Sequence, residues 1–542
     1  MTRPAPPALA LVLALTLAAC DAGFEGDLRE NRAPDTELSV RSSDLRDDLD
    51  GRRVLSTVEV SWSGTDADGV VTAYDVRSYP SDAAPADGEG WARTARRDST
   101  LRLAIPLGQS TADVVVEVRA VDDEGAVDPT PARTVFPIVN SPPTLRLVAA
   151  EAPPDTTWPV VSFAVAAADV DGEANLAGLE VSLNDGPPVR LDADVTFLTL
   201  VAEDPRADVT AAAVYTGRGF RNAGVALDGL RLDADNVLTV QAVDQAGATS
   251  APVRYPALDD AGDPVETFFV RRVTSDVLLV NDVRVGDDAL VLGVAAEALA
   301  VHGTASYDEW DLSATPQSTA SPRLSDALPV SADPTLRQTL ALWDRIYWVS
   351  NAVTNSAVGN NLPLAATVLD LFFERGGRIL VQVPVSLPQG ADAGGTANAA
   401  IDLLPLSALV TFPTGVTFLR AGRGTPLRPV ADVPGTGRAL PALEAQRIVT
   451  GAVPYAVGPD DVPLYRMSFY EGTRPEDAWT GPEVVASIRA DRRTALFGLP
   501  LFAGTNPFFG PAEGGTEGVV DALALLLDGL EFPRGTARLA RR

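Results

Sequence analysis

The chain contains 542 residues and has a formal net charge of −30, from 73 acidic and 43 basic side chains. A surface this acidic repels phosphate backbones and anionic lipid headgroups, which excludes nucleic acid as a partner and a basic membrane-binding patch. Apolar residues make up 46% of the sequence, which is enough for several packed cores and is typical of a globular chain.

The N-terminus is predicted to be an export signal. Residues 8–19 are small or apolar and follow Arg3, but they are too few to span a bilayer, which takes about 20 apolar residues. The segment ends in the letters LAAC at Cys20 and resembles the lipobox of bacterial lipoproteins. The resemblance implies a signal peptide at residues 1–19 and acylation of Cys20, as by palmitate. The alternative is an ordinary secretory signal with a chance cysteine.

Cys20 is the single cysteine of the chain. Once it carries lipid, the mature protein has no thiol, which excludes an internal disulfide, a thiolate nucleophile and a cysteine-ligated zinc ion. We expect no cofactor, and we expect residues 20–32 to be a polar tether between anchor and body. The predicted location is a membrane of the bacterial cell envelope, the outer membrane or cell surface rather than the inner membrane.

An internal repeat follows the tether. The segment NRAPDTEL at 31–38 is echoed by NSPPTLRL at 140–147, and VRAVDDEGAVDPTPAR at 118–133 is echoed by VQAVDQAGATSAPVR at 240–254. The spacing of about 100 to 120 residues is the size of one β-sandwich domain. The repeat therefore predicts two such domains in succession.

The first repeat unit shows the alternation of β-strands. Val58, Val60 and Trp62 alternate with polar residues, and Tyr74 stands in the next expected strand. Large aromatic residues at such positions are most simply core residues.

This pattern resembles fibronectin type III and related immunoglobulin-like modules. The resemblance covers residues 33–138 and implies a sandwich whose core contains the tryptophan and the tyrosine. The second copy, residues 139–273, is looser, with Phe163 near the tryptophan position. Such modules usually act as spacers or binding domains.

Two pairs of aspartates are candidates for a calcium site. Asp66 and Asp68 stand in GTDADG, and Asp169 and Asp171 stand in ADVDG, with carboxylates at alternate positions as an oxygen-seeking cation prefers. Asp-Gly pairs are also common turn formers, and no twelve-residue calcium loop is present. We favour turns over metal sites.

From Thr274 onward, buried strands alternate with helices, which predicts a doubly wound α/β domain over residues 274–535 and a short tail at 536–542. Within it, we expect Asn361 to cap a helix that ends at Gly376. The expected strands are at 276–282, 307–312, 344–351, 379–385 and 494–502, and the expected helices are at 287–300, 335–342, 361–376 and 517–530.

The domain resembles the class I glutamine amidotransferase-like fold, a flavodoxin-like arrangement, through DVLLVND, FFERGGRILV and FGLPLF. An active member of that family places a cysteine on the turn after the strand here written ILVQV, and a histidine near the C-terminus. In this chain the turn is Pro384, Val385 and Ser386, and the single histidine, His302, lies far upstream. The resemblance therefore implies a pseudoenzyme.

The sequence leaves two classes of function open. The first is a non-catalytic, lipid-anchored envelope protein that binds or scaffolds a protein or glycan, with Tyr307, Asp308, Trp310 and Ser386 as weak candidate binding residues. The alternative is a carboxylate-dependent hydrolase of envelope or extracellular polysaccharide. Its acidic pair would come from the cluster YDEWD and would need carboxyl groups about 5 to 10 Å apart across a cleft.

Overall fold

The computed structural model describes residues 30–40, 53–283, 288–312, 327–351, 361–385, 402–410, 412–450, 452–503, 505–512 and 514–535. The signal peptide, Cys20 and Ser386 lie outside the described residues. Contacts divide the chain into two compact units. The first unit comprises residues up to 142 with the short segments 169–175 and 245–248, and the second unit comprises the rest.

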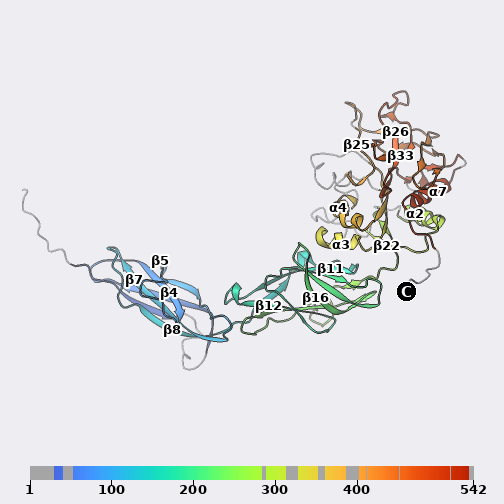
Figure 1. Cartoon of the computed structure of the whole chain (residues 1–542). Helices are drawn as coiled ribbons and strands as arrows, with labels where there is room; N and C mark the ends of the chain where they lie inside the picture. Colours follow the sequence, from blue (N-terminus) through green and yellow to red (C-terminus); the bar gives the residue numbers. More distant parts are fainter. Residues whose placement is uncertain are drawn as a thin grey trace, which may run out of the picture. The chain divides into compact units, whose positions relative to one another are not determined.

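The first unit contains a sandwich of two sheets (Figure 1). One sheet has the strand order β1-β3-β6 and the other β2-β8-β7-β4-β5. The strands are β1 (Asp35–Val40), β2 (Val54–Leu55), β3 (Thr57–Thr65), β4 (Val71–Pro80), β5 (Ala92–Thr94), β6 (Asp98–Arg102), β7 (Thr111–Asp122) and β8 (Ala132–Val139).

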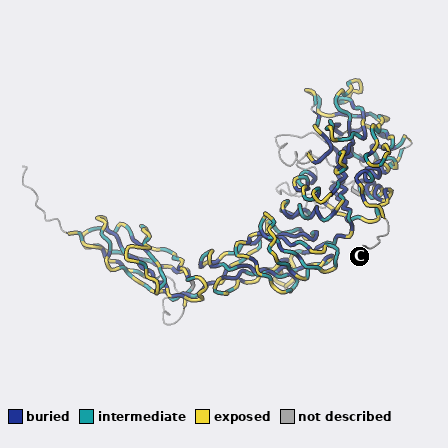
Figure 2. The backbone as a smooth tube through the Cα atoms, in the orientation of Figure 1, coloured by how far each residue is buried: buried dark blue, intermediate teal, exposed yellow. Residues whose placement is uncertain are grey.

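The core of this sandwich matches the sequence prediction. Val58, Val60 and Trp62 of β3 are buried, and the ring of Trp62 lies 6.3 Å from that of Tyr74 on β4. Figure 2 shows buried residues recurring between more exposed ones along the backbone of this sandwich. The period-two alternation therefore determined which face of β3 enters the core.

The second unit begins with another sandwich. Its sheets have the orders β16-β15-β14-β11-β9 and β13-β12-β18-β19, with a small sheet β10-β20-β17 beside them. Phe163 of β11 is buried against Tyr255 and Phe268. The strands are β9 (Thr144–Leu147), β10 (Thr156–Thr157), β11 (Val160–Ala168), β12 (Leu176–Leu183), β13 (Val189–Leu191), β14 (Phe197–Ala202), β15 (Val209–Thr216), β16 (Arg221–Arg231), β17 (Ala234–Asp235), β18 (Leu238–Asp244), β19 (Val253–Tyr255) and β20 (Phe269–Val270).

The repeat seen in the sequence has a structural counterpart in two loops. At the end of β7, Val121 forms an isolated antiparallel bridge with Val127, and at the end of β18, Val243 forms one with Thr249. Both bridges join residues six apart in sequence and lead into the next strand, β8 or β19. The similar segments at 118–133 and 240–254 therefore form the same type of turn.

A mixed sheet forms the remainder of the second unit. Its parallel part has the order β22-β21-β23-β24-β36, and antiparallel strands β35, β33, β27, β30 and β39 continue it. The parallel strands are β21 (Val277–Asn281), β22 (Asp308–Asp311), β23 (Arg345–Val349), β24 (Arg378–Gln382) and β36 (Thr494–Phe497). The antiparallel strands are β27 (Pro426–Pro429), β30 (Leu443–Ala445), β33 (Asp461–Arg466), β35 (Val484–Arg489) and β39 (Phe509–Gly510).

Helices cover both faces of the parallel part. Helices α2 (Asp288–His302) and α7 (Glu517–Gly529) share a core with Val277 and Leu279, whereas Leu278 and Val280 point into a second core. That second core contains residues of η4 (Ala332–Leu336), α3 (Arg337–Leu340), α4 (Leu362–Ala366) and α5 (Asp370–Glu374). The continuous apolar run of β21 is thus buried on both faces, as expected for a parallel strand.

One predicted helix differs from the structure. Residues 361–376 form two short helices, α4 and α5, and the Asn361 side chain does not cap the first. Its amide nitrogen instead donates a hydrogen bond to Asp282 at 2.6 Å. The Asn361 side chain, which the local sequence predicted to cap the helix, is therefore bound by the buried carboxylate of Asp282, far away in the sequence. None of the helices in the described ranges is long and apolar enough to cross a membrane.

Trp158 joins the second sandwich to the core of the mixed sheet within the second unit. It precedes β11, is 2% exposed, and belongs to the core cluster that contains Trp310 and Trp343. Its ring centroid lies 4.7 Å from that of Trp343 and 6.3 Å from that of Trp310, both in edge-on geometry. Edge-on aromatic contacts stabilise packing beyond the area they bury.

Candidate binding sites

The acidic cluster at YDEWD does not present its carboxylates together. Asp308 and Trp310 of β22 are buried, whereas Glu309 and Asp311 are exposed. Because neighbouring side chains of a strand point to opposite faces, the Asp308 carboxyl group lies across the strand from those of Glu309 and Asp311.

The Asp308 carboxylate is held inside the fold. It accepts hydrogen bonds from the backbone N–H of Thr274 at 3.1 Å, from that of Ser275 at 3.2 Å and from Trp343 Nε1 at 2.8 Å. Tyr307 is half-buried against the core, where burial and then the nearby Glu309 raise the pKa of its hydroxyl. These contacts account for Asp308 as a structural group.

The carboxyl ends of the parallel strands carry a second buried carboxylate. Asp282, which follows β21, is fully buried and accepts hydrogen bonds from Asn361 N at 2.6 Å and from Trp348 Nε1 at 3.0 Å. After β24, Pro384 and Val385 are buried. Asp282 therefore links the end of β21 to Trp348 of β23 and to Asn361 at the start of α4.

His302 ends helix α2 and is 5% exposed. Its Nδ1 lies 2.9 Å from Thr304 Oγ1, and its Nε2 lies 3.2 Å from Asp528 Oδ1 on α7. Burial lowers the pKa of the imidazole, and the Asp528 carboxylate opposes that change. The geometry ties His302 to the packing of α2 against α7.

The calcium candidates form turns. The Asp68 N–H donates to Asp66 Oδ1 at 3.2 Å, and the Asp171 N–H donates to Asp169 Oδ1 at 2.7 Å. Both are the side-chain-to-backbone turn in which aspartate bonds the residue two positions on. Within the described ranges, no group of three or more His, Cys, Asp or Glu side chains is placed to hold a metal ion.

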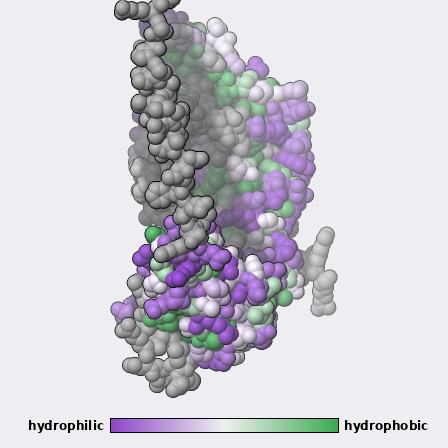
Figure 3. All heavy atoms as spheres, turned by 90° about the vertical axis from the view of Figure 1, so that its left-hand side faces the viewer, coloured by the Kyte–Doolittle hydropathy of each residue, from purple (hydrophilic) through white to green (hydrophobic). Residues whose placement is uncertain are grey.

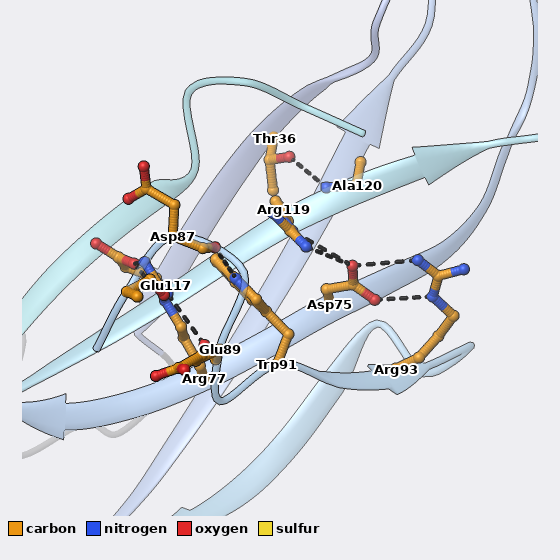
Figure 4. A network of polar contacts seen from close by, with 11 residues as sticks. Thr36, Asp75, Arg77, Asp87, Glu89, Trp91, Arg93, Glu117, Arg119 and Ala120 are labelled. Atoms are coloured by element: carbon orange, nitrogen blue, oxygen red, sulfur yellow. Dashed lines mark hydrogen bonds and ion pairs between the residues drawn. The ribbon is translucent and has the colours of Figure 1, made fainter. Parts of the chain in front are cut away.

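A polar network that the sequence analysis did not identify lies on the five-stranded sheet of the first sandwich (Figure 4). Asp75 of β4 is 3% exposed and accepts hydrogen bonds from Arg93 Nε of β5 at 2.8 Å and from Arg119 Nη2 of β7 at 3.2 Å. The Arg93 guanidinium, together with that of Arg119, holds the pKa of the Asp75 carboxyl below its ordinary value.

The same network includes the Glu117 carboxylate and the ring of Trp91, both of which contact arginine side chains. The Glu117 carboxylate of β7 accepts hydrogen bonds from Arg77 Nε at 2.8 Å and from the Tyr79 hydroxyl at 2.7 Å. Although burial favours the neutral acid, these hydrogen bonds lower the pKa of Glu117. The guanidinium carbons of Arg77 and Arg119 lie 4.1 and 4.0 Å from the ring centroid of Trp91, which is cation–π distance.

A groove of about 490 Å³ opens beside this network, between strands β5 and β6. Its apolar lining comes from Trp62, Val76 and Leu101. Its charged lining comes from Arg77, Arg93 and Arg96, and none of the described residues that line it is acidic. This lining contrasts with the excess of acidic residues in the chain as a whole. The three arginines come from β4, from β5 and from the turn after β5, and no pattern in the sequence connects them.

The network predicts a dependence of stability on pH. Because the folded pKa of Asp75 is lowered, its stabilising contribution is present above the pKa of an unperturbed aspartate, about 3.9, and is lost as the pH falls through the folded value. The difference in unfolding free energy between wild type and Asp75→Asn should therefore shrink from about pH 6 to about pH 2.5. Hydrogen exchange of β4 and β5, corrected for the intrinsic exchange rate at each pH, measures it, with the exposed Asp82→Asn as control. An equal difference in unfolding free energy at both pH values would contradict the stabilisation of the charged Asp75 carboxylate by the two arginines.

Comparison with known proteins gives similarities in fold only. The fibronectin III-like modules of Clostridium thermocellum CbhA are 12% identical over 40% of this chain and 91% of that chain, with a TM-score of 0.14. The PKD1 domain of the Vibrio cholerae metalloprotease PrtV is 14% identical over 20% of this chain and 99% of that domain, with a TM-score of 0.14. Chicken CNTN1 domains FN1–FN3 are 11% identical over 45% of this chain and 68% of that chain, with a TM-score of 0.15.

No protein-family profile and no curated protein sequence matches the chain. The TM-scores are low, so the fold assignment depends on the strand pairings of the molecule itself. Those pairings form mainly antiparallel sheets packed face to face around common cores. The chain is a β-sandwich domain protein.

Proposed function

We propose that this chain is a non-catalytic lipoprotein of the bacterial envelope that binds a partner. The observation that supports binding most directly is the arginine-lined groove of the first sandwich, which is rimmed by residues fixed in the network of Figure 4. A pocket with an apolar floor and a few fixed polar groups is the usual form of a ligand site.

We further propose that the C-terminal part is a flavodoxin-like domain of the amidotransferase type without its chemistry. The parallel strand order β22-β21-β23-β24-β36 supports this, because in chain order it reads 2-1-3-4-5. The chain has one cysteine, Cys20 at its N-terminus, so a thiol nucleophile after β24 has no source. The single histidine contacts Thr304 and Asp528, which supports a packing role for it.

The lipid anchor gives a test of the lipoprotein assignment. In cells supplied with an alkyne-labelled palmitate, the wild-type chain should incorporate label and sediment with membranes. Cys20→Ser should abolish both, because several acyl chains at about 0.8 kcal/mol per buried methylene provide the attachment. Ala10→Leu, which keeps the apolar stretch, should leave both unchanged. Label retained in Cys20→Ser would refute the anchor.

Cross-linking of the full lipoprotein in native membranes, followed by affinity capture and mass spectrometry, tests the binding role. We expect one envelope partner at near-stoichiometric yield, and we expect the groove variant Arg96→Glu to reduce that yield. If envelope polysaccharide is cleaved and no partner is captured, the hydrolase alternative replaces this proposal.

A further inference from the structure

The groove of the first sandwich lies between two sheet edges. Strand β5 is the last strand of the order β2-β8-β7-β4-β5, and β6 is the last strand of the order β1-β3-β6. Edge strands carry backbone groups that remain available for pairing with another strand. Charged residues and proline usually protect such an edge, but the centre of β6 reads Ser99, Thr100 and Leu101.

The pairing of β6 with β3 identifies which backbone groups face the open edge. The Trp62 N–H donates to the Arg97 carbonyl at 2.9 Å, and the Leu103 N–H donates to the Ser56 carbonyl at 2.7 Å. In an antiparallel pair, residues alternate between bonding the partner strand and pointing away from it. The odd-numbered residues of β6 therefore bond β3. The N–H and carbonyl groups of Thr100 point toward the edge that no described strand pairs with, where the Ser99 hydroxyl lies 3.5 Å from the Thr100 carbonyl oxygen.

The charge of the groove identifies the kind of partner. The Arg96 side chain is exposed and makes no hydrogen bond or ion pair with any part of the chain that the structure describes. Its backbone is fixed, because its carbonyl accepts a hydrogen bond from Trp62 Nε1 at 2.8 Å. The Arg93 side chain is 60% exposed. The Arg93 guanidinium is thus held by Asp75 but remains largely exposed, and Arg96 adds an exposed guanidinium without a carboxylate partner among the described residues.

We propose that β6 binds an extended acidic segment of a partner protein, which adds to the three-stranded sheet as a fourth strand. The segment pairs with the outward backbone groups of Thr100. Alternate side chains enter the groove over Leu101 and Val76, and its carboxylates meet Arg93 and Arg96. The inference rests on the proposed binding role and names the partner for the groove.

An acidic glycan fits the groove less well. Sugars stack on exposed aromatic rings, but Trp62 is 4% exposed and Trp91 has two guanidinium groups against its ring. Among the residues drawn in colour, the face shown in Figure 3 is mixed, with hydrophilic residues predominating and apolar ones in small patches. Charge and backbone pairing are the means of recognition that the groove arginines and the outward backbone groups of Thr100 offer.

Fluorescence anisotropy of the full chain in detergent tests the proposal. The probe is a fluorescein-labelled eight-residue peptide in which glutamate and valine alternate. Comparison ligands are the same peptide with lysine in place of glutamate and an oligosaccharide of glucuronic acid. We expect the glutamate peptide to bind at least about tenfold more tightly than either, because it alone offers both opposite charge and an extended backbone.

Three variants separate charge from strand pairing. Thr100→Pro removes the outward N–H and should weaken binding about tenfold, whereas Thr100→Ala keeps that N–H and should change binding less than about twofold. Arg96→Glu should exchange the preference, so that the lysine peptide binds more tightly than the glutamate peptide. Circular dichroism melting curves verify that each variant is folded.

Equal binding by Thr100→Pro and Thr100→Ala would overturn strand addition, as would binding of the oligosaccharide as tight as that of the glutamate peptide. Failure of the peptide to bind, with a partner still captured from membranes, would overturn this inference and leave the proposed function standing. Failure of both experiments would overturn the proposed function as well.

Discussion

Replacing Trp158 with alanine is expected to lower the local free energy of unfolding by about 3–5 kcal/mol, the usual cost of truncating a large buried aromatic side chain. Trp158 is 2% exposed and its ring contacts those of Trp310 and Trp343. The guanidinium carbon of Arg271 lies 4.3 Å from the ring centroid and loses its cation–π partner in the variant.

Hydrogen exchange measured by mass spectrometry is the appropriate readout, because a multidomain chain does not unfold in one two-state transition. Amides of β11 and β22 should exchange faster in Trp158→Ala, and those of β3 and β4 in the first unit should not. Trp158→Phe keeps an aromatic ring and should lower the local free energy of unfolding less than Trp158→Ala does. Unchanged exchange in β22 would show that Trp158 does not stabilise the mixed sheet.

Asp308→Ala is the second change with a large expected effect. It leaves the N–H groups of Thr274 and Ser275 and Trp343 Nε1 without their acceptor. Each unsatisfied buried donor costs about 1–3 kcal/mol, so we expect a total loss of about 3–5 kcal/mol after relaxation. Because these donors flank the start of β21, the loss should appear there and in β22.

Glu309→Ala is the matched control, since Glu309 is the neighbouring carboxylate on the exposed face of the same strand. It should change stability by less than about 0.5 kcal/mol. Hydrogen exchange of β21 and β22, measured by mass spectrometry, compares the two variants. If Asp308→Ala is as stable as wild type, the carboxylate is not structural, and its candidacy as a binding or catalytic group returns.

The role predicted from the sequence for Asp308 and its neighbour Trp310 differs from the role that the structure gives them. Trp310 and Asp308 stood out as candidate binding residues because acidic and aromatic side chains occur together at YDEWD. The structure buries both, and the hydrogen-bond donors come from segments 34 and 35 residues away. Composition within a short segment cannot show whether a carboxylate is saturated by distant donors, so the cluster resembled a site.

The arginines of the proposed binding surface, by contrast, were not identified from the sequence and became apparent only in the structure. Arg77, Arg93, Arg96 and Arg119 were not singled out, because each is an ordinary arginine in a strand or a turn. Pairing of β4 with β5 and β7 places Arg93 and Arg119 beside Asp75. The groove arises because the two sheets end in different edge strands, and which strands are edges is a property of the topology.

The sequence by itself determined the strand faces of the first sandwich, the repeated turn after β7 and β18, the strands β21, β23 and β24, and helices α2 and α7. The strand faces follow from a period of two, β21, β23 and β24 from continuous apolar runs, α2 from a run of good helix formers and α7 from a period of 3.6 residues, all of which a short segment contains in full. Only the tertiary structure decided the division of residues 361–376 into α4 and α5, the saturation of Asp282 and Asp308, and the antiparallel strands between β24 and α7. Each depends on contacts between residues far apart in sequence, whose free energies no local pattern records.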